Sequence, residues 1–197
     1  CKCNYNNLDN MNEQIEAAIK VLKEGGVILY PTDTIWGLGC DATNPQAVEK
    51  IYKIKNRAES KSLIVLAADA DMICRYVKEI PEMAITLLEI NDKPMTIIYP
   101  GAMGLANNAV AEDGSIGIRV PEHQFCKALL KKFRKPIIST SANISGETAP
   151  VYYKEIPQNI KDAADWIADA ELEGDSTHSA SQIIKLGLGG EVEIIRK

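Results

Sequence analysis

The sequence has few cysteines and histidines, and this limits the metal and disulfide chemistry that it can support. Its five cysteines are odd in number and mostly scattered (Cys1, Cys3, Cys40, Cys74 and Cys126). Such a set is not typical of a disulfide framework, so we expect a reduced, cytoplasmic protein. The two histidines, His123 and His178, are too few for a multi-histidine metal site.

Long apolar runs and the common nucleotide and hydrolase motifs are also absent. No run approaches the roughly 18 apolar residues that a membrane-spanning helix needs, so no membrane association is expected. The sequence contains no G-x-x-x-x-G-K-[ST] loop, no G-x-G-x-x-G, no H-E-x-x-H and no paired C-x-x-C. A Ser-His-Asp system stays open, but no G-x-S-x-G elbow supports it.

Positive charge is in the minority overall but is concentrated in one segment. The 22 Lys and Arg residues face 27 Asp and Glu residues, for a net charge of -5, which argues against coating nucleic acid through bulk charge. Residues 50–61 nevertheless carry five cations and one acid, whereas residues 162–175 carry six acids and no base. The acidic total therefore hides a local cationic segment.

Length and hydrophobic patterning predict one α/β domain over residues 1–197. Helices are expected from a cap at Asn10 or Asn12 to the Gly25-Gly26 stop, and over 45–54, 69–77, 81–90 and 123–133. Strands are expected over 27–30, 62–68, 95–99, 116–120, 136–139, 166–168, 181–186 and 192–195. Helices interleave with strands early and strands cluster late, which predicts an open sheet that is mixed rather than purely parallel.

Polar residues at i, i+2 spacing follow several of these elements. Thr32 and Thr34 follow one strand run, and Ser139, Ser141 and Asn143 follow another. Residues two apart face the same way in extended chain, so each set can present its side chains to one pocket. For any one hydroxyl a turn is the better interpretation, but the recurrence favours a ligand site at the ends of strands.

The cations allow two interpretations. Lys50 and Lys53 fit a solvated helix face, whereas Lys55, Arg57 and Lys61 lie past the expected helix and would suit a polyphosphate. The cluster at residues 131–135 is adequately explained by the dipole of a helix C-terminus, with weak tRNA or RNA contact as the minority interpretation. Arg119 is equally consistent with an exposed strand residue and with a carboxylate-binding group beside Gly117.

Four segments, in order, carry a family resemblance. YPTDTIWGLGCDA, KIKNRAESKSLIVL, IGIRVPEH and STSANISG resemble the YrdC-type threonylcarbamoyl-AMP synthases, in their short, single-domain form. The resemblance runs from about residue 27 to 196, and the pairing of K-x-R with S-x-N is its most specific part. It implies a twisted α/β sheet with a deep, positively lined cavity. It also implies that L-threonine, bicarbonate or CO2, and ATP are joined into threonylcarbamoyl-AMP with release of pyrophosphate.

The resemblance also implies roles for single residues. Lys55, Arg57, Ser141 and Asn143 would form the central tetrad. The threonine site would comprise Thr34, Arg119, Ser141 and Ser181, and the ATP site Arg57, Lys61, Ser115, Asn143 and Arg196. Mg2+ would accompany the ATP phosphates, and the product would pass to a tRNA threonylcarbamoyl transfer complex.

Some positions depart from the family pattern, and other functions stay open. Leu66 stands where some members carry a histidine, Gln182 replaces a threonine, and residues 102–114 and 147–153 are candidates for the loop that closes the cavity. One alternative is a non-catalytic RNA-binding or ribosome-maturation protein. A second is a carbamoyl-adenylate enzyme using carbamoyl phosphate, and a third is a domain with no activity of its own.

Overall fold

The computed structural model describes the backbone of residues 2–56 and 63–197, and the side chains from residue 9 onward in these ranges. The helices are α1 (Lys2–Lys23), α2 (Pro45–Lys55), α3 (Ala70–Tyr76), α4 (Glu82–Ile90), α5 (Gln124–Phe133) and α6 (Gln158–Ala163). The strands are β1 (Ile28–Tyr30), β2 (Gly37–Gly39), β3 (Ile64–Leu66), β4 (Met95–Tyr99), β5 (Ile116–Arg119), β6 (Ile137–Ser141), β7 (Trp166–Ile167), β8 (Gln182–Leu186) and β9 (Val192–Arg196). Three 3-10 turns, at residues 107–109, 153–155 and 170–173, complete the described elements.

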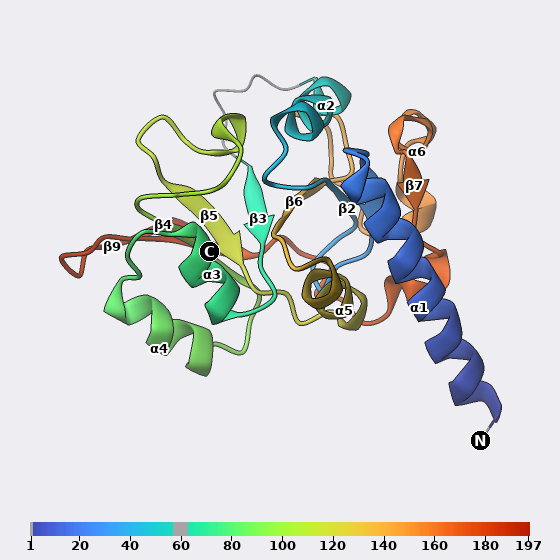
Figure 1. The fold of residues 1–197 in the computed structure, drawn as a ribbon, viewed down its shortest axis with the longest axis horizontal. Helices are drawn as coiled ribbons and strands as arrows, with labels where there is room; N and C mark the ends of the chain where they lie inside the picture. Colours follow the sequence, from blue (N-terminus) through green and yellow to red (C-terminus); the bar gives the residue numbers. More distant parts are fainter. Residues whose placement is uncertain (1, 57–62) are drawn as a thin grey trace.

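The strands form one open, mixed sheet in the order β7-β1-β2-β6-β3-β5-β4-β8-β9 (Figure 1). Pairs β1–β7, β3–β5 and β4–β8 are parallel, and the other five pairs are antiparallel. The predicted mixed α/β sheet with flanking helices is therefore confirmed. The order also brings β3, β5 and β6 to the middle of the sheet, where the candidate site lies.

Strand β2 is the one strand that the sequence did not predict. Its Gly-Leu-Gly sequence offers no β-branched or aromatic residue. Gly39 is needed there because a Cβ at this position would lie 2.6 Å from the Ile138 carbonyl oxygen and 2.7 Å from the Tyr30 ring. Close packing against β6 and Tyr30, rather than strand propensity, determines this element.

Two boundaries differ from prediction in ways that affect the site. Helix α2 is capped by Asn44, whose side chain accepts hydrogen bonds from the N–H groups of Gln46 and Ala47, and it runs through Lys55. Lys55 is thus the last helical residue, and the expectation that it lies past the helix was wrong. Strand β6 likewise extends through Ser141 rather than ending at Ser139.

The two faces of the central strands have different environments. On β4, Ile97 and Tyr99 are buried in the apolar core, while the alternate residues Thr96 and Ile98 line a cavity on the opposite face. On β5, Ile118 belongs to the core, and its neighbour Arg119 lines the cavity. The period of two therefore separates an apolar face from a polar, ligand-accessible face.

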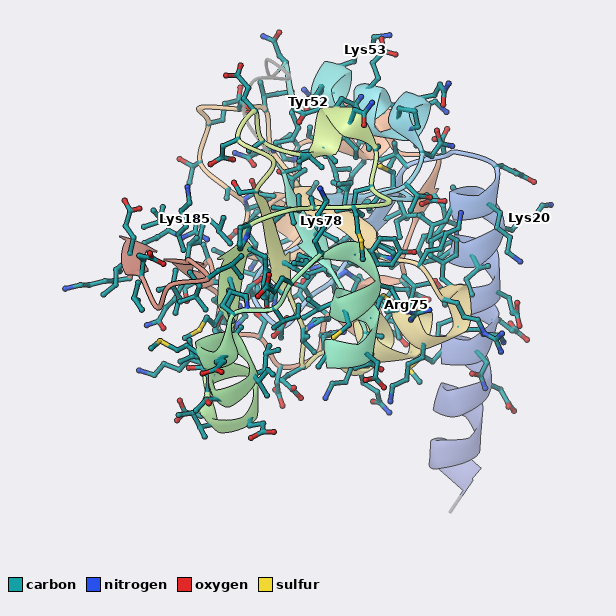
Figure 2. The ribbon with its side chains drawn as sticks, turned by 60° about the vertical axis from the view of Figure 1, so that its left-hand side comes forward. Lys20, Tyr52, Lys53, Arg75, Lys78 and Lys185 are labelled. Atoms are coloured by element: carbon teal, nitrogen blue, oxygen red, sulfur yellow. The ribbon has the colours of Figure 1, made fainter. Side chains whose placement is uncertain are left out.

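Charged side chains lie mainly on the outside of the molecule. Figure 2 shows Lys20, Lys53 and Lys185 pointing away from the body of the protein. Within the basic cluster at the end of α5, Lys132 pairs with Glu16 and Lys135 with Asp41. Among the described residues, no helix is both long enough and apolar enough to cross a membrane.

Candidate active site

A cavity of about 570 Å3 lies over the polar face of the sheet. Strands β2, β3, β4, β5, β6, β8 and β9 and the turn after β1 contribute to its wall. The charged residues among its described lining are Arg119, Arg196 and Glu147. The rest of the wall combines apolar side chains with hydroxyl groups. Much of the wall comes from within strands, so the prediction of a site at strand ends was only partly right.

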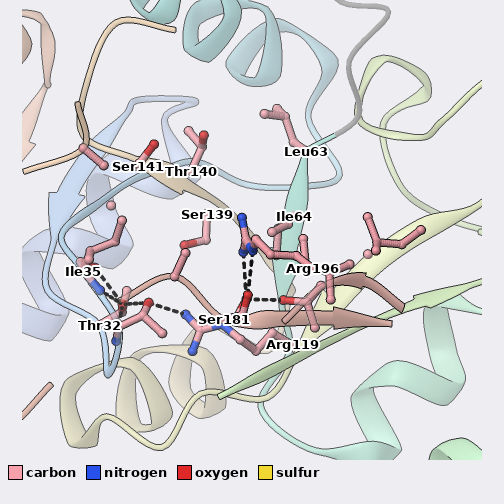
Figure 3. A pocket seen from close by; sticks show the side chains of 18 of the residues that line it. Thr32, Ile35, Leu63, Ile64, Arg119, Ser139, Thr140, Ser141, Ser181 and Arg196 are labelled. Atoms are coloured by element: carbon pink, nitrogen blue, oxygen red, sulfur yellow. Dashed lines mark hydrogen bonds between the residues drawn. The ribbon is translucent and has the colours of Figure 1, made fainter. Parts of the chain in front are cut away.

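The turn after β1 presents two threonine hydroxyls to Arg119. The Oγ1 atoms of Thr32 and Thr34 lie 2.8 Å apart, and Thr32 Oγ1 donates to the carbonyl oxygen of Ile35 at 2.7 Å. Arg119 Nη2 donates to Thr34 Oγ1 at 3.3 Å (Figure 3). Arg119 is only 4% exposed, so the interpretation of an exposed strand arginine was wrong.

Behind Arg119 lies Asp33, a residue that the sequence did not single out. Asp33 Oδ1 accepts a hydrogen bond from Arg119 Nη1 at 2.5 Å, and its Oδ2 accepts one from the Glu122 N–H at 3.1 Å. Asp33 does not line this cavity; it pairs with the guanidinium from the side away from it. The guanidinium of Arg119 is therefore fixed by the two consecutive residues Asp33 and Thr34.

Lys55 connects the end of α2 to the end of β6. Its ammonium group donates to the carbonyl oxygens of Ser141, at 2.6 Å, and Asn143, at 2.7 Å. Ser141 and Asn143 both line the cavity, whereas Lys55 does not belong to the described lining. The ammonium group thus holds two residues of the cavity wall in place, and the predicted part of Lys55 in the central tetrad stays a prediction.

Ser181 is held by two partners at the other end of the cavity. Its Oγ lies 2.8 Å from Thr96 Oγ1, and Arg196 Nε donates to its carbonyl oxygen at 2.8 Å (Figure 3). Burial lowers the pKa of Arg196, and the positive charge of Arg119 lowers it further. An arginine keeps its proton nonetheless. Two guanidinium groups that repel one another on one wall favour a ligand with negative charge.

Ser115 is fixed by a neighbouring carboxylate. Its backbone N–H and its hydroxyl both donate to Asp113 Oδ1, at 3.0 and 2.6 Å, and Lys185 Nζ donates to Asp113 Oδ2 at 3.1 Å. The hydrogen bonds from Ser115 and Lys185 lower the pKa of Asp113 to about 2. Asp113 is therefore ionised at neutral pH and keeps the Ser115 hydroxyl oriented, with its lone pairs free to accept.

The structure thus brings most of the predicted site residues to one cavity. Those that line it are Thr34, Ser115, Arg119, Ser141, Asn143, Ser181 and Arg196. Arg57 and Lys61 lie outside the described residues, so their predicted contact with ATP stays a prediction. Leu66 and Gln182, which depart from the family pattern, are not part of the described lining.

One of the two candidate closing loops contributes to the wall. Glu147 and Ala149 line the cavity, whereas no residue of 102–114 does so. Glu173 braces this region, because its Oε2 accepts hydrogen bonds from Trp36 Nε1 at 2.6 Å and from the Tyr153 N–H at 2.7 Å. The centroids of the Trp36 and Tyr153 rings lie 5.0 Å apart.

Comparison with known proteins identifies the family of this chain. The family model Sua5/YciO/YrdC, described as telomere recombination, matches residues 20–197. The chain therefore belongs to the Sua5/YciO/YrdC family. This confirms the resemblance inferred from the four sequence segments.

Members of the Sua5/YciO/YrdC family share most of the length of this chain. It is 32% identical over 184 residues to a threonylcarbamoyl-AMP synthase of Vibrio parahaemolyticus, covering 89% of this chain and 100% of that protein. A threonylcarbamoyl-AMP synthase of Pseudoalteromonas translucida is 34% identical over 181 residues, with 90% and 95% covered. The structure of P. abyssi Sua5 complexed with L-threonine superposes with a TM-score of 0.80 at 28% identity, covering 87% of this chain. The chain spans 50% of that longer protein.

Several residues of this family site were missed by sequence reasoning. Thr96 is fully buried in a strand whose other residues are Met, Ile and Tyr, and a threonine among them was the available signal. Asp33, Asp113 and Glu173 act through partners. Asp33 and Glu173 are separated from theirs by 86 and 137 positions, so no local pattern could have revealed these two.

Proposed function

We propose that this chain is a threonylcarbamoyl-AMP synthase, a nucleotidyltransferase that joins L-threonine, bicarbonate or CO2, and ATP and releases pyrophosphate. Enzymes of this name match nearly the whole chain. The observation that carries the proposal is the pair Arg119 and Arg196 in the wall of one cavity, among hydroxyl groups and with Glu147 as the one acid of the described lining. Such a wall suits a ligand set that carries a carboxylate and a triphosphate.

The reaction needs no nucleophile from the protein. The threonine amine attacks CO2, loses a proton and becomes a carbamate; a carbamate oxygen then attacks the α-phosphorus of ATP, and the bond to the β-phosphate oxygen breaks as pyrophosphate leaves. The chain must therefore position reactants and stabilise charge. This agrees with the absence of an elbow motif from the sequence. A carbamate is unstable in water, so an enclosing wall is an advantage.

The described residues divide into two groups in this proposal. Arg119 takes the threonine carboxylate, with Thr34, Ser141 and Ser181 orienting the amino acid. Ser115, Asn143 and Arg196 face ATP, together with Arg57 and Lys61, which the resemblance assigns. Asn143 is prepared for such contact because its Nδ2 donates to the Glu147 carbonyl oxygen at 2.7 Å, and this bond fixes the amide.

Magnesium would enter with the nucleotide rather than sit in a protein cage. Among the described residues, no group of three or more His, Cys, Asp or Glu side chains could hold a metal ion. Mg2+ prefers oxygen ligands and keeps few protein contacts, so phosphate oxygens and water fit it better than this wall does. When bound, it would neutralise phosphate charge.

The proposed product is an activated carbamate that is useful only to a downstream acceptor. We therefore expect it to pass to a complex that transfers the threonylcarbamoyl group to tRNA. The pairing of Lys132 and Lys135 with acids leaves less free positive charge for direct RNA binding at the end of α5.

The deciding experiment measures pyrophosphate release with ATP, Mg2+ and bicarbonate. Release should require L-threonine and should fall to background with L-serine or no amino acid. Arg57→Ala should abolish release while the circular dichroism spectrum stays unchanged. RNA binding with steep salt dependence and no threonine-dependent release would instead support the non-catalytic alternative.

A further inference from the structure

Asp33 lies between the two threonines of the site turn but faces a different part of the molecule. Thr32 and Thr34 line the cavity of the candidate site, whereas Asp33 lines a second cavity of about 890 Å3. Met95 and Ile97 of β4 line this second cavity, while Thr96 and Ile98 line the first, so the two cavities lie on opposite faces of the sheet. The Asp33 carboxylate therefore stands at the boundary between them.

Two segments that are distant in sequence, residues 119–122 and the segment at Thr177, contact Asp33. Its two carboxylate oxygens accept hydrogen bonds from Arg119 Nη1, at the end of β5, and from the backbone N–H of Glu122, just before α5. Its own carbonyl oxygen accepts a hydrogen bond from the Thr177 N–H at 2.9 Å. The segment after Thr177 leads to Ser181, another of the predicted threonine-binding residues. The side chain and the backbone carbonyl of Asp33 thus connect both sides of the proposed amino-acid site.

The Asp33 contact also fixes the direction of Arg119. A buried guanidinium needs compensation for its charge, and the Asp33 side chain is only 11% exposed itself. With Nη1 on Asp33 and Nη2 on Thr34, the plane of the guanidinium cannot rotate freely. Among the described residues, the Nε of Arg119 has no hydrogen-bond acceptor, and Arg119 lines the first cavity.

We propose that Asp33 is a positioning residue for the amino-acid substrate: it aims Arg119 at the substrate carboxylate and holds the 177–181 segment in register. The proposal rests on the proposed function, because it takes L-threonine as the ligand of Arg119. It concerns threonine affinity and not the ATP site. Loss of Asp33 should therefore raise the KM for threonine much more than the KM for ATP.

The second cavity allows an experiment that distinguishes a positioning role of Asp33 from a purely structural role. Asp33→Ala removes the carboxylate and leaves its place open to that cavity, through which formate can enter and stand behind Arg119. Threonine KM should rise about 10–100-fold, as expected when a binding group is misplaced by an ångström, with ATP KM changed less than threefold. Formate at high concentration should restore much of the threonine affinity, while chloride at equal ionic strength should not.

Asp69→Ala is the matched control, because Asp69 lines the same cavity but caps α3 through the Met72 N–H at 2.8 Å. It should leave threonine KM unchanged and show no response to formate. Asp33→Glu provides a second variant that keeps the charge. Its extra methylene should displace the guanidinium and raise threonine KM.

The outcomes separate this inference from the proposed function. A wild-type protein without threonine-dependent pyrophosphate release overturns the proposed function. An active wild type, with unchanged threonine KM in folded Asp33→Ala or Asp33→Glu, overturns the positioning role alone. Failure of both variants to fold in the presence of formate assigns Asp33 to folding and also overturns it.

Discussion

Lys55 and Asn143 are joined through one ammonium group, which donates to the Asn143 carbonyl oxygen at 2.7 Å and lies 3.3 Å from its Oδ1. The same group donates to the Ser141 carbonyl oxygen. Lys55 is 2% exposed, so these contacts replace the water that a lysine normally keeps. Lys55 of the K-x-R motif thus forms a structural joint with the S-x-N segment beneath the cavity.

Lys55→Met should destabilise the protein and remove activity together. The change leaves one buried and one part-buried carbonyl oxygen without their charged donor, so the free energy of unfolding should fall by about 2–4 kcal/mol. Urea denaturation measures this directly. Lys53→Met is the matched control, because Lys53 is 72% exposed and pairs with Glu49 one turn earlier; it should change stability by less than about 0.5 kcal/mol. Equal stability of both variants would contradict the joint.

The contacts of Lys55 show which parts of the site could be predicted from the sequence. Of the residues that the motifs selected, Lys55, Ser141 and Asn143 meet in the structure, and Arg119 lines the cavity from β5. The inward direction of the Lys55 side chain could not be predicted from the sequence, because it depends on one extra residue at the end of α2. Helix ends depend on caps and tertiary contacts, here Asn56 in a left-handed conformation.

The carboxylates that support the site could not be predicted from the sequence, for a different reason. Asp33 and Glu173 contact partners that only the complete sheet brings near, and in the sequence they resemble ordinary turn and surface acids. In the sequence, residues 162–175 stand out only as a stretch with six acids and no base. The structure shows that Glu173 within it is half-buried and accepts two hydrogen bonds.

Glu173→Ala should loosen the wall between β2 and the 147–153 loop. Trp36 Nε1 and the Tyr153 N–H both lose their acceptor, which should cost about 1–3 kcal/mol of unfolding free energy. In a Trp166→Phe background, Trp36 is the only tryptophan, so its emission should shift to longer wavelength as water enters.

Glu171→Ala is the appropriate control for this change. Glu171 lies in the same 3-10 turn but is exposed, so its loss should alter neither stability nor emission. If Glu173→Ala matches Glu171→Ala in both measurements, Glu173 does not brace the wall.

His123 makes the stability of the fold depend on pH. Its Nε2 lies 3.1 Å from the Glu173 carbonyl oxygen, and its buried Nδ1 has no hydrogen-bond partner among the described residues. Burial lowers the pKa of His123; the Glu173 carbonyl, Asp33 and the Leu172 backbone oppose this shift, and Arg119 adds to it. The ring is therefore neutral in the folded protein at neutral pH and donates through Nε2.

The sign of the pH effect follows from where the proton binds. The unfolded chain takes up a proton at His123 near its ordinary pKa of about 6.5, whereas the folded chain takes it up only at lower pH. Stability from this group is thus present above pH 6.5 and is lost as pH falls below that value, at no more than about 1.4 kcal/mol per pH unit. His123→Gln keeps a donor for the Glu173 carbonyl but cannot titrate. The stability difference between wild type and His123→Gln, measured by urea unfolding, should shift in favour of the variant from pH 8 to pH 5. Parallel curves for wild type and His123→Gln would contradict the assignment.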